Sequence, residues 1–382
     1  MNRTKNNLTI IFLFYLISLS IQAQDMHFEW GRNDGSDQNT NELKSLASDD
    51  AKHVFAFTNF ELEYDIDGYT YYSEGGKDLL LYAVNESGEV EWVSQQGGID
   101  NEYAQEVKCD SDGNVYIIGK FHESLVMEGI TYSSNGSFDM FLAKYSNTGA
   151  FLWCKTLGGP NSESLVSLQL KYNRIIVAGR FYDYTVIEDD TLFSQAGTDV
   201  FLAKFDLDGN LRHTQTIGGE GVDMVSDMGV DAAGNIYVTG DFYKDINFGG
   251  GYSFDVGDLL GVYVAKFNPS LNIIWAYQII GDDLKPGIKL GVAADGSCGL
   301  MGVFSSNVYI GSSHYTSNAG REELYMANLS PDMQLNWAKH FYAESSLSLV
   351  DVELDREGGT YIAGPYSGDV HFDDLVLDYT LC

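Results

Sequence analysis

The chain repeats itself with a period of about 61 residues, and this periodicity constrains its fold more than any other feature. Three independent series of residues keep the period. An aromatic series has spacings of 61, 60, 61, 62 and 62 residues and consists of Phe60, Phe121, Phe181, Phe242, Phe304 and Tyr366. An alanine series inside apolar runs such as "MFLAKY" consists of Ala83, Ala143, Ala203, Ala265 and Ala327. A tryptophan series consists of Trp30, Trp92, Trp153, Trp275 and Trp337, with His213 in its vacant position.

Each repeat has the pattern of four β-strands. Alternating apolar and polar residues rich in Val, Ile, Tyr and Phe, as in 227–242 and 262–280, are typical of half-buried strands. Short turns with Gly and Asn, such as "DSDGN" at 110–114, separate them. We expect one strand before this turn, one that ends at the aromatic residue, the "FLAK" strand and the tryptophan strand. The double glycines five residues after the tryptophan position, such as Gly97–Gly98, predict a crossover to the next repeat.

A repeat made only of strands packs best as a propeller, in which no long sheet edge stays exposed. The sequence therefore predicts an all-β fold, a β-propeller of about six four-stranded antiparallel blades with about 61 residues per blade. The last blade should be incomplete. The aromatic and tryptophan series have six members, whereas a sixth "FLAK" strand would start about 20 residues after Tyr366, beyond Cys382. Gly119, Gly179, Gly240, Gly302 and Gly364 lie inside strands, where we expect a tryptophan from an adjacent blade to approach.

Two segments resemble a known repeat. "DSDGNVYIIGKF" (110–121) and "FDMFLAKYSNTGAFLWCKTLGG" (138–159) are similar to the SBBP-type β-propeller repeat of secreted bacterial proteins. The resemblance extends from Phe28 to the C-terminus. It implies a propeller fold and an extracellular or cell-surface setting, and it implies no activity, because the family is defined by its scaffold.

The N-terminus has the pattern of a secretory signal peptide. Basic residues Arg3 and Lys5 precede an apolar run at 8–19, and small Ala23 follows. We expect residues 1–23 to be removed and residues 24–382 to form a single β-propeller domain, truncated at its C-terminus. The protein is then secreted (extracellular, cell-surface or periplasmic), without membrane insertion after signal cleavage.

The net charge of −33, from 22 basic and 55 acidic residues, restricts the partners. Such a chain repels nucleic acid and anionic lipid. A glycan or a cationic protein surface remains compatible with it, and the partner itself is unknown.

No motif for catalysis, metal binding or a cofactor stands out. The Asp-x-Asp-Gly segments (65–68, 110–113 and 206–209) offer fewer ligands than a calcium loop needs, so we interpret them as hairpin turns. Lys144, Lys204 and Lys266 share one repeat position, which Val84 and Asn328 occupy elsewhere, and this favours solvated or ion-paired lysines over a common binding ring.

The variable loops at one end of the repeats are the predicted ligand site. In a propeller, the crossovers and the turns between the second and third strands share a face, and function is commonly located in such loops. These loops contain carboxylates and tyrosines, which suit sugars or cationic groups. The candidate residues are Asp100, Glu102, Tyr182, Asp183, Asp223, Tyr243, Asp245, Asp282 and Asp283.

Three functions fit this sequence. The first is a non-enzymatic binding scaffold that uses its acidic, tyrosine-containing loop face. The second is a glycan-active hydrolase or lyase with carboxylates at the central channel, a chemistry that needs two carboxylates from different blades. The third is a structural spacer from a larger multidomain adhesin.

Overall fold

A computed structural model describes residues 41–344, 346–347, 351–354, 359–364, 366–372 and 375–377. The predicted signal peptide, Trp30 and Cys382 lie outside these residues. The chain divides between residues 216 and 217 into two compact units, an N-terminal unit with described residues 41–216 and a C-terminal unit with described residues 217–377, and each is described by itself. The single domain from residue 24 to 382 stays a prediction.

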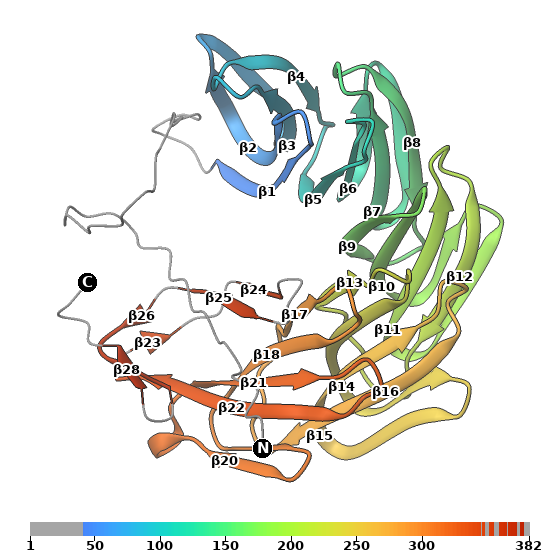
Figure 1. The fold of residues 1–382 in the computed structure, drawn as a ribbon. Coiled ribbons are helices and arrows are strands. Elements are labelled where there is room, and N and C mark those ends of the chain that lie inside the picture. The colour runs from blue at the N-terminus through green and yellow to red at the C-terminus, as the bar shows by residue number, and fades with distance from the viewer. Residues whose placement is uncertain are drawn as a thin grey trace. The chain divides into compact units, whose positions relative to one another are not determined.

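The N-terminal unit contains three four-stranded antiparallel sheets, each with its strands paired in chain order (Figure 1). The first sheet consists of β1 (Glu42–Ser48), β2 (Val54–Ile66), β3 (Tyr69–Val84) and β4 (Val90–Gln96). The second consists of β5 (Glu102–Cys109), β6 (Val115–Met127), β7 (Ile130–Tyr145) and β8 (Phe151–Leu157). The third consists of β9 (Ser164–Lys171), β10 (Arg174–Ile187), β11 (Asp190–Asp206) and β12 (Leu211–Ile217), which ends at the unit boundary.

The first strand of the second sheet, β5, contacts both β1 and β9, the first strands of its neighbours. In the first and second sheets, a side chain accepts a hydrogen bond from the backbone of the next sheet. The Val107 N–H donates to Ser45 Oγ at 3.2 Å, and the Leu168 N–H donates to Glu106 Oε2 at 2.6 Å. These bonds satisfy backbone groups at strand edges that would otherwise be unpaired.

The C-terminal unit contains two larger antiparallel sheets. One has the order β13 (Asp227–Val230), β14 (Ile236–Gly249), β15 (Tyr252–Phe267), β16 (Ile273–Gly281), β19 (Asn307–Ile310) and β20 (Ser313–Thr316). The other has the order β17 (Lys289–Val292), β18 (Cys298–Phe304), β21 (Glu323–Leu329), β22 (Leu335–Ala343), β27 (Val370–Phe372) and β28 (Leu375–Leu377).

Two short strand pairs complete this unit: β23 (Ser346–Leu347) with β26 (Tyr366–Ser367), and β24 (Asp351–Leu354) with β25 (Thr360–Ala363). Besides strands, the described residues contain one short 3-10 helix, η1 (Asn318–Gly320). The predicted all-β fold is confirmed. Within the described part of the chain, no helix has the length and apolar character that a membrane crossing requires.

The tryptophan series follows the sheets as predicted, and the alanine series needs a correction. Trp92, Trp153, Trp275 and Trp337 lie on β4, β8, β16 and β22, the fourth strand of each repeat. Trp153 pairs with Lys144, whereas Trp92 pairs with Ala83. Ala83 therefore occupies the lysine position, and the placement of Val84 there was wrong by one residue.

Of the two arrangements expected at the shared lysine position, solvated or ion-paired, the second occurs at Lys266, whose Nζ lies 4.0 Å from Asp231 Oδ2. Lys144 is buried, lies over the Tyr116 ring at 5.0 Å and donates to the Leu207 carbonyl at 3.2 Å. Lys266 is buried over the Tyr237 ring at the same distance.

The second and third strands of the first four repeats are longer than predicted, whereas in the fifth repeat β18 ends at Phe304 as predicted. β6 does not end at Phe121; after a bulge at Glu123 (φ 58°) it continues to Met127, and a two-residue turn at Glu128 and Gly129 with positive φ leads into β7. Each long hairpin therefore extends beyond its aromatic residue. We call these extensions the arms and define them as residues 62–72, 123–133, 183–193 and 244–254.

The recurring strand glycines accommodate an aromatic ring from the same sheet. A Cβ at Gly179 would lie 2.6 Å from ring atoms of Phe201, its partner on the next strand, and a Cβ at Gly302 would lie 2.4 Å from Tyr325 Oη. The expected tryptophan contact is elsewhere. Trp92 packs against Gly149 in the β7–β8 turn and donates its Nε1–H to the Asn147 carbonyl at 3.1 Å.

The Asp-x-Asp-Gly segment at 206–209 is a hairpin turn closed by its first aspartate. Asp206 Oδ1 accepts hydrogen bonds from the N–H groups of Asp208 (3.0 Å) and Asn210 (2.9 Å). Burial alone would raise the pKa of Asp206, but these bonds, the Asn210 side chain and Arg212 together hold it well below its usual range.

The substitution Asp206→Asn should therefore have a pH-dependent effect. A carboxyl group with a depressed folded-state pKa stabilises fully above its ordinary pKa of about 4, and this contribution is lost as the pH falls through the lower folded value. We expect the difference in melting temperature between the wild type and Asp206→Asn to be largest at neutral pH and to shrink in acid. The exposed Asp208→Asn is the control. A difference that stays constant from pH 7 to pH 3 would contradict the role of the charge.

Candidate functional site

The crossovers between sheets pack against the base of the next arm. The Val126 N–H donates to the Gly97 carbonyl at 2.7 Å, and the Gly97 N–H donates back at 3.3 Å. A Cβ at Gly98 would lie 2.0 Å from the Ser124 carbonyl oxygen. Gly159 and Gly219 make equally close approaches to arm carbonyls. The double glycines therefore form the predicted crossovers, and they permit a backbone contact that a side chain would block.

The predicted site residues meet where a crossover reaches an arm, one group per repeat. Asp100 Oδ2 lies 2.7 Å from His122 Nδ1. In the C-terminal unit, Asp245 Oδ1 accepts from the Glu220 N–H at 3.0 Å, and Asp282 Oδ2 accepts from Asn307 Nδ2 at 2.6 Å. The nine residues thus belong to four successive repeats.

Two corrections apply to the expected loop face. Glu102 and Asp223 are not on an exposed rim; both side chains are fully buried. Tyr182, Asp183, Tyr243 and Asp245 lie beside a bulge within a long strand and not in a turn. Tyr182 and Tyr243 are nevertheless exposed, by 51% and 38%.

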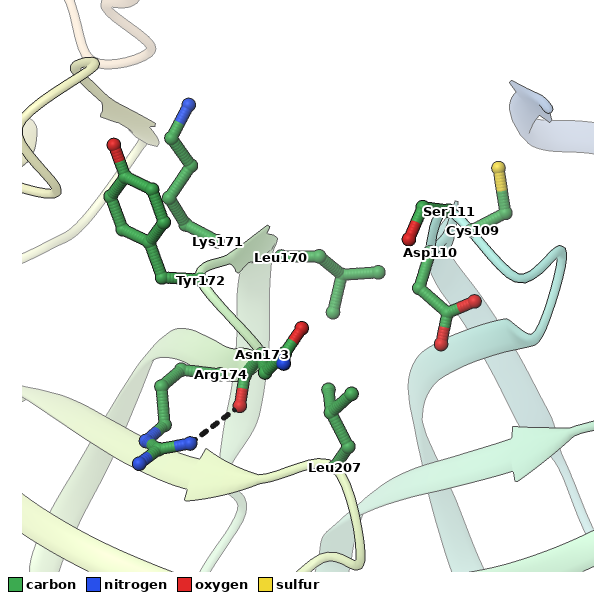
Figure 2. A pocket seen from close by; sticks show the side chains of 9 residues that line it. All are labelled: Cys109, Asp110, Ser111, Leu170, Lys171, Tyr172, Asn173, Arg174 and Leu207. Atoms are coloured by element: carbon green, nitrogen blue, oxygen red, sulfur yellow. Dashed lines mark hydrogen bonds between the residues drawn. The ribbon is translucent and has the colours of Figure 1, made fainter. Parts of the chain in front are cut away.

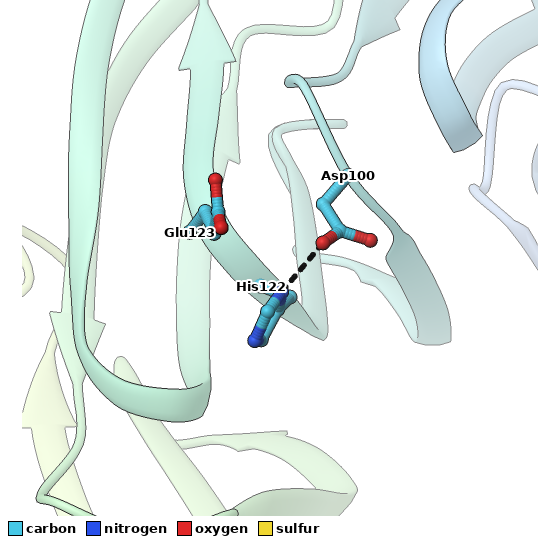
Figure 3. Close-up of side chains that lie close together, drawn as sticks. All are labelled: Asp100, His122 and Glu123. Atoms are coloured by element: carbon cyan, nitrogen blue, oxygen red, sulfur yellow. Dashed lines mark hydrogen bonds and ion pairs between the residues drawn. The ribbon is translucent and has the colours of Figure 1, made fainter.

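Figure 3 shows the group formed by Asp100, His122 and Glu123, in which one potential metal ligand of each residue lies within 4.8 Å of the others. Both carboxylate oxygens of Asp100 are already used, since Oδ2 bonds His122 and Oδ1 accepts from Asn101 Nδ2 at 2.7 Å. The hydrogen bond from His122 lowers the pKa of Asp100. We therefore interpret the group as a surface hydrogen bond between His122 and Asp100, with Glu123 beside it. His122 and Glu123 were not predicted, because no local spacing links them to Asp100.

A pocket of 320 Å³ lies at the turns of the second and third sheets (Figure 2). Its lining consists of Cys109, Asp110, Ser111, Leu170, Lys171, Tyr172, Asn173, Arg174 and Leu207. Its polar groups bond within the chain: Arg174 donates to the Asn173 carbonyl at 2.7 Å, and Asp110 Oδ2 accepts from Tyr116 Oη at 2.9 Å. Nothing in this lining indicates a particular ligand, and the sequence did not predict the pocket.

Five carboxyl groups of the described N-terminal unit are fully buried, and of these Glu102 alone was predicted from the sequence. One of the five is Asp199, and the other four recur with the repeat. They form the repeat-related pairs Asp78 with Glu102 and Asp139 with Glu163, and all four are fully buried. Burial and then the charge of Asp78 raise the pKa of Glu102 to about 9, and burial raises that of Glu163 to about 7. Burial also raises the pKa of Asp78 to about 6 and that of Asp139 above its usual value. The signal available in the sequence for these buried groups was an acidic residue that recurs after 61 residues within otherwise apolar strands.

No family model matches the chain. It is similar to an uncharacterized WD repeat-containing protein of Acanthamoeba polyphaga mimivirus, with 22% identity over 264 residues. The match covers 57% of this chain and 19% of that protein, so the chain spans about a fifth of the relative's length.

Proposed function

We propose that the chain is a secreted β-propeller of about six blades, the last incomplete, that acts as a non-enzymatic binding scaffold for a cationic protein surface. Support for the propeller comes from the sheets in chain order, from the contacts between β1, β5 and β9, and from the similarity to a WD repeat-containing protein. WD repeats form four-stranded propeller blades. The SBBP-type resemblance supports secretion.

The observation that carries the binding function is the surface of the arms. The three arms of the N-terminal unit contain nine acidic residues and no lysine, arginine or histidine. The same arms expose large apolar side chains: Leu62 by 64%, Tyr69 by 71%, Tyr72 by 65%, Ile130 by 49% and Phe193 by 66%.

Aromatic faces beside carboxylates favour lysine and arginine side chains, through cation–π contacts and ion pairs. Exposed aromatic residues are also frequent binding hot spots. The arms therefore fit a basic protein surface better than a neutral glycan.

The alternative of a glycan-active hydrolase or lyase gains no support from the paired carboxylates. Asp78, Glu102, Asp139 and Glu163 are fully buried, so a substrate does not reach them in this conformation.

Binding of the mature protein to arrays of lysine- and arginine-rich peptides, with glycan arrays and glycan hydrolysis assayed in parallel, tests the function. We expect salt-sensitive peptide binding that weakens about tenfold or more in a Tyr69→Ser, Tyr72→Ser, Phe193→Ser variant. A double variant with Asp65→Asn and Asp189→Asn should mainly make peptide binding less sensitive to salt. Lys171→Ala, at the pocket, is the control. Unchanged peptide binding in the aromatic variant, or binding and turnover of glycans alone, would contradict the proposal.

A further inference from the structure

The buried carboxyl pairs recur with the repeat. Asp78 and Asp139 lie on the third strands, opposite Phe60 and Phe121, and are 61 residues apart in the sequence. Glu102 and Glu163 lie where each crossover enters the next sheet and have the same separation. Each pair therefore links a third strand to the start of the following sheet.

Most oxygens of these carboxyl groups have no hydrogen-bond donor. Asp78 Oδ2 accepts from Gln95 Nε2 at 2.9 Å and from the Glu74 N–H at 3.2 Å, and Asp139 Oδ2 accepts from the N–H and Nδ2 of Asn135 at 3.0 Å. The Oδ1 atoms of both aspartates and both oxygens of Glu102 and Glu163 have no partner. Each pair thus leaves three buried oxygens unsatisfied, although buried polar groups are normally hydrogen-bonded or bound to a cation.

No basic side chain acts on the glutamates. The charged groups that influence the pKa of Glu102 are Asp78 and Asp100, and both raise it. For Glu163 the charged group is Asp139, which also raises the pKa, while nearby peptide N–H groups lower it only partly. When both acids of a pair are ionised, no basic side chain therefore neutralises their charge.

The crossover from the fourth repeat to the fifth supports the interpretation that the two acids belong together. Phe242 pairs with Gly261 where Phe121 pairs with Asp139, and Leu284 bridges Phe304 where Glu102 pairs with Phe121. Both carboxyl groups are thus replaced at the same crossover, from the fourth repeat to the fifth, as expected if they serve one ligand.

We propose that each Asp–Glu pair binds one hard divalent cation of the calcium class. Two carboxylates neutralise the charge of such an ion, and the donor set is made of oxygen, which calcium prefers over nitrogen or sulfur. Asp139 Oδ1 and both oxygens of Glu163 supply three of the six to eight ligands that calcium takes, and water and peptide carbonyls complete the set. The bound ion joins two neighbouring sheets at the crossover.

Calcium binding to the full mature protein, stripped with a chelator, tests the proposal. We expect saturable binding at constant ionic strength and a rise in melting temperature on the order of 5 °C. Glu163→Gln and Glu102→Gln should each lower the bound calcium by one ion per chain. Asp112→Asn removes an exposed turn carboxylate and should leave the count unchanged, which separates site binding from screening of the surface charge.

Asp139→Asn provides a second variant for the same site, and far-UV circular dichroism confirms which variants are folded. A wild type that binds no calcium saturably overturns the proposal. So does a folded Glu163→Gln or Asp139→Asn variant that keeps the wild-type count. If the pairs are instead neutralised by protons alone, calcium will not change the melting temperature and Glu163→Gln will be as stable as the wild type, which also overturns it.

Discussion

Replacing Gly98 with valine is expected to destabilise the N-terminal unit by about 3 kcal/mol or more. Its Cβ would lie 2.0 Å from the Ser124 carbonyl oxygen, which belongs to backbone and cannot turn away as a side chain can. Relief requires the crossover to move off the arm, and this breaks the two hydrogen bonds between Gly97 and Val126.

Urea unfolding monitored by circular dichroism measures this effect. Gly129→Asn is the matched control, because Gly129 lies at an arm tip with φ 77° and no atom within 4 Å of its Cβ position. Asn tolerates this backbone conformation, so the control should change stability by less than about 1 kcal/mol. Equal losses in both variants would show that the crossover contact is not the cause.

Trp275→Ala is expected to destabilise the C-terminal unit by about 3–5 kcal/mol. Trp275 is only 5% exposed, packs edge-on against Tyr237 with ring centroids 5.8 Å apart, and donates its Nε1–H to the Pro331 carbonyl at 3.0 Å. Truncation to alanine leaves a cavity and removes one of the two hydrogen bonds to the Pro331 carbonyl, which also accepts from Lys266 Nζ at 3.1 Å.

Trp275→Phe separates these two contributions. It retains most of the apolar contact and loses the hydrogen bond, so we expect it to cost about 1 kcal/mol. Hydrogen exchange of β14 to β16 reports the local loss. Equal exchange rates in the alanine and phenylalanine variants would mean that packing of the indole contributes little.

The repeat predicted the parts of the fold that depend on local signals. The Asp-x-x-Gly-Asn turns close through the side chain of their own aspartate, as in Asp206, and the double glycines mark crossovers because only glycine permits the contact at Gly98. Both are properties of a few consecutive residues, so one sequence is enough to detect them.

The arms were missed because a bulge inverts the strand alternation. Glu123 at φ 58° adds a residue to one strand, so the apolar pattern after Phe121 restarts out of phase and is easily taken for a loop. The candidate site was displaced for the same reason: Tyr182 and Asp183 were assigned to a turn that lies several residues further along the chain.

The buried acids were missed for a different reason. A single sequence suggests that a charged residue faces solvent, and Asp139 is buried only because the following crossover covers it. The prediction for the alanine series was wrong in the first repeat. Alignment of identical residues selected Ala83, whereas the hydrogen-bond register places Tyr82 at the alanine position.

The hydrogen bonds between the first strands of neighbouring sheets constrain the sequence of only one of the two repeats that each bond joins. In the three bonds of this kind, the donor is a peptide N–H of the following repeat, which almost any residue supplies. The acceptor is a side chain: Ser45, Glu106 and, in the C-terminal unit, Asp227, which accepts from the Leu290 N–H at 3.1 Å. Three different residue types therefore perform one task. The donor position can therefore change freely during evolution, whereas the acceptor position must keep a side-chain oxygen. A duplicated or transplanted repeat should fit the fold if the repeat before it supplies that oxygen.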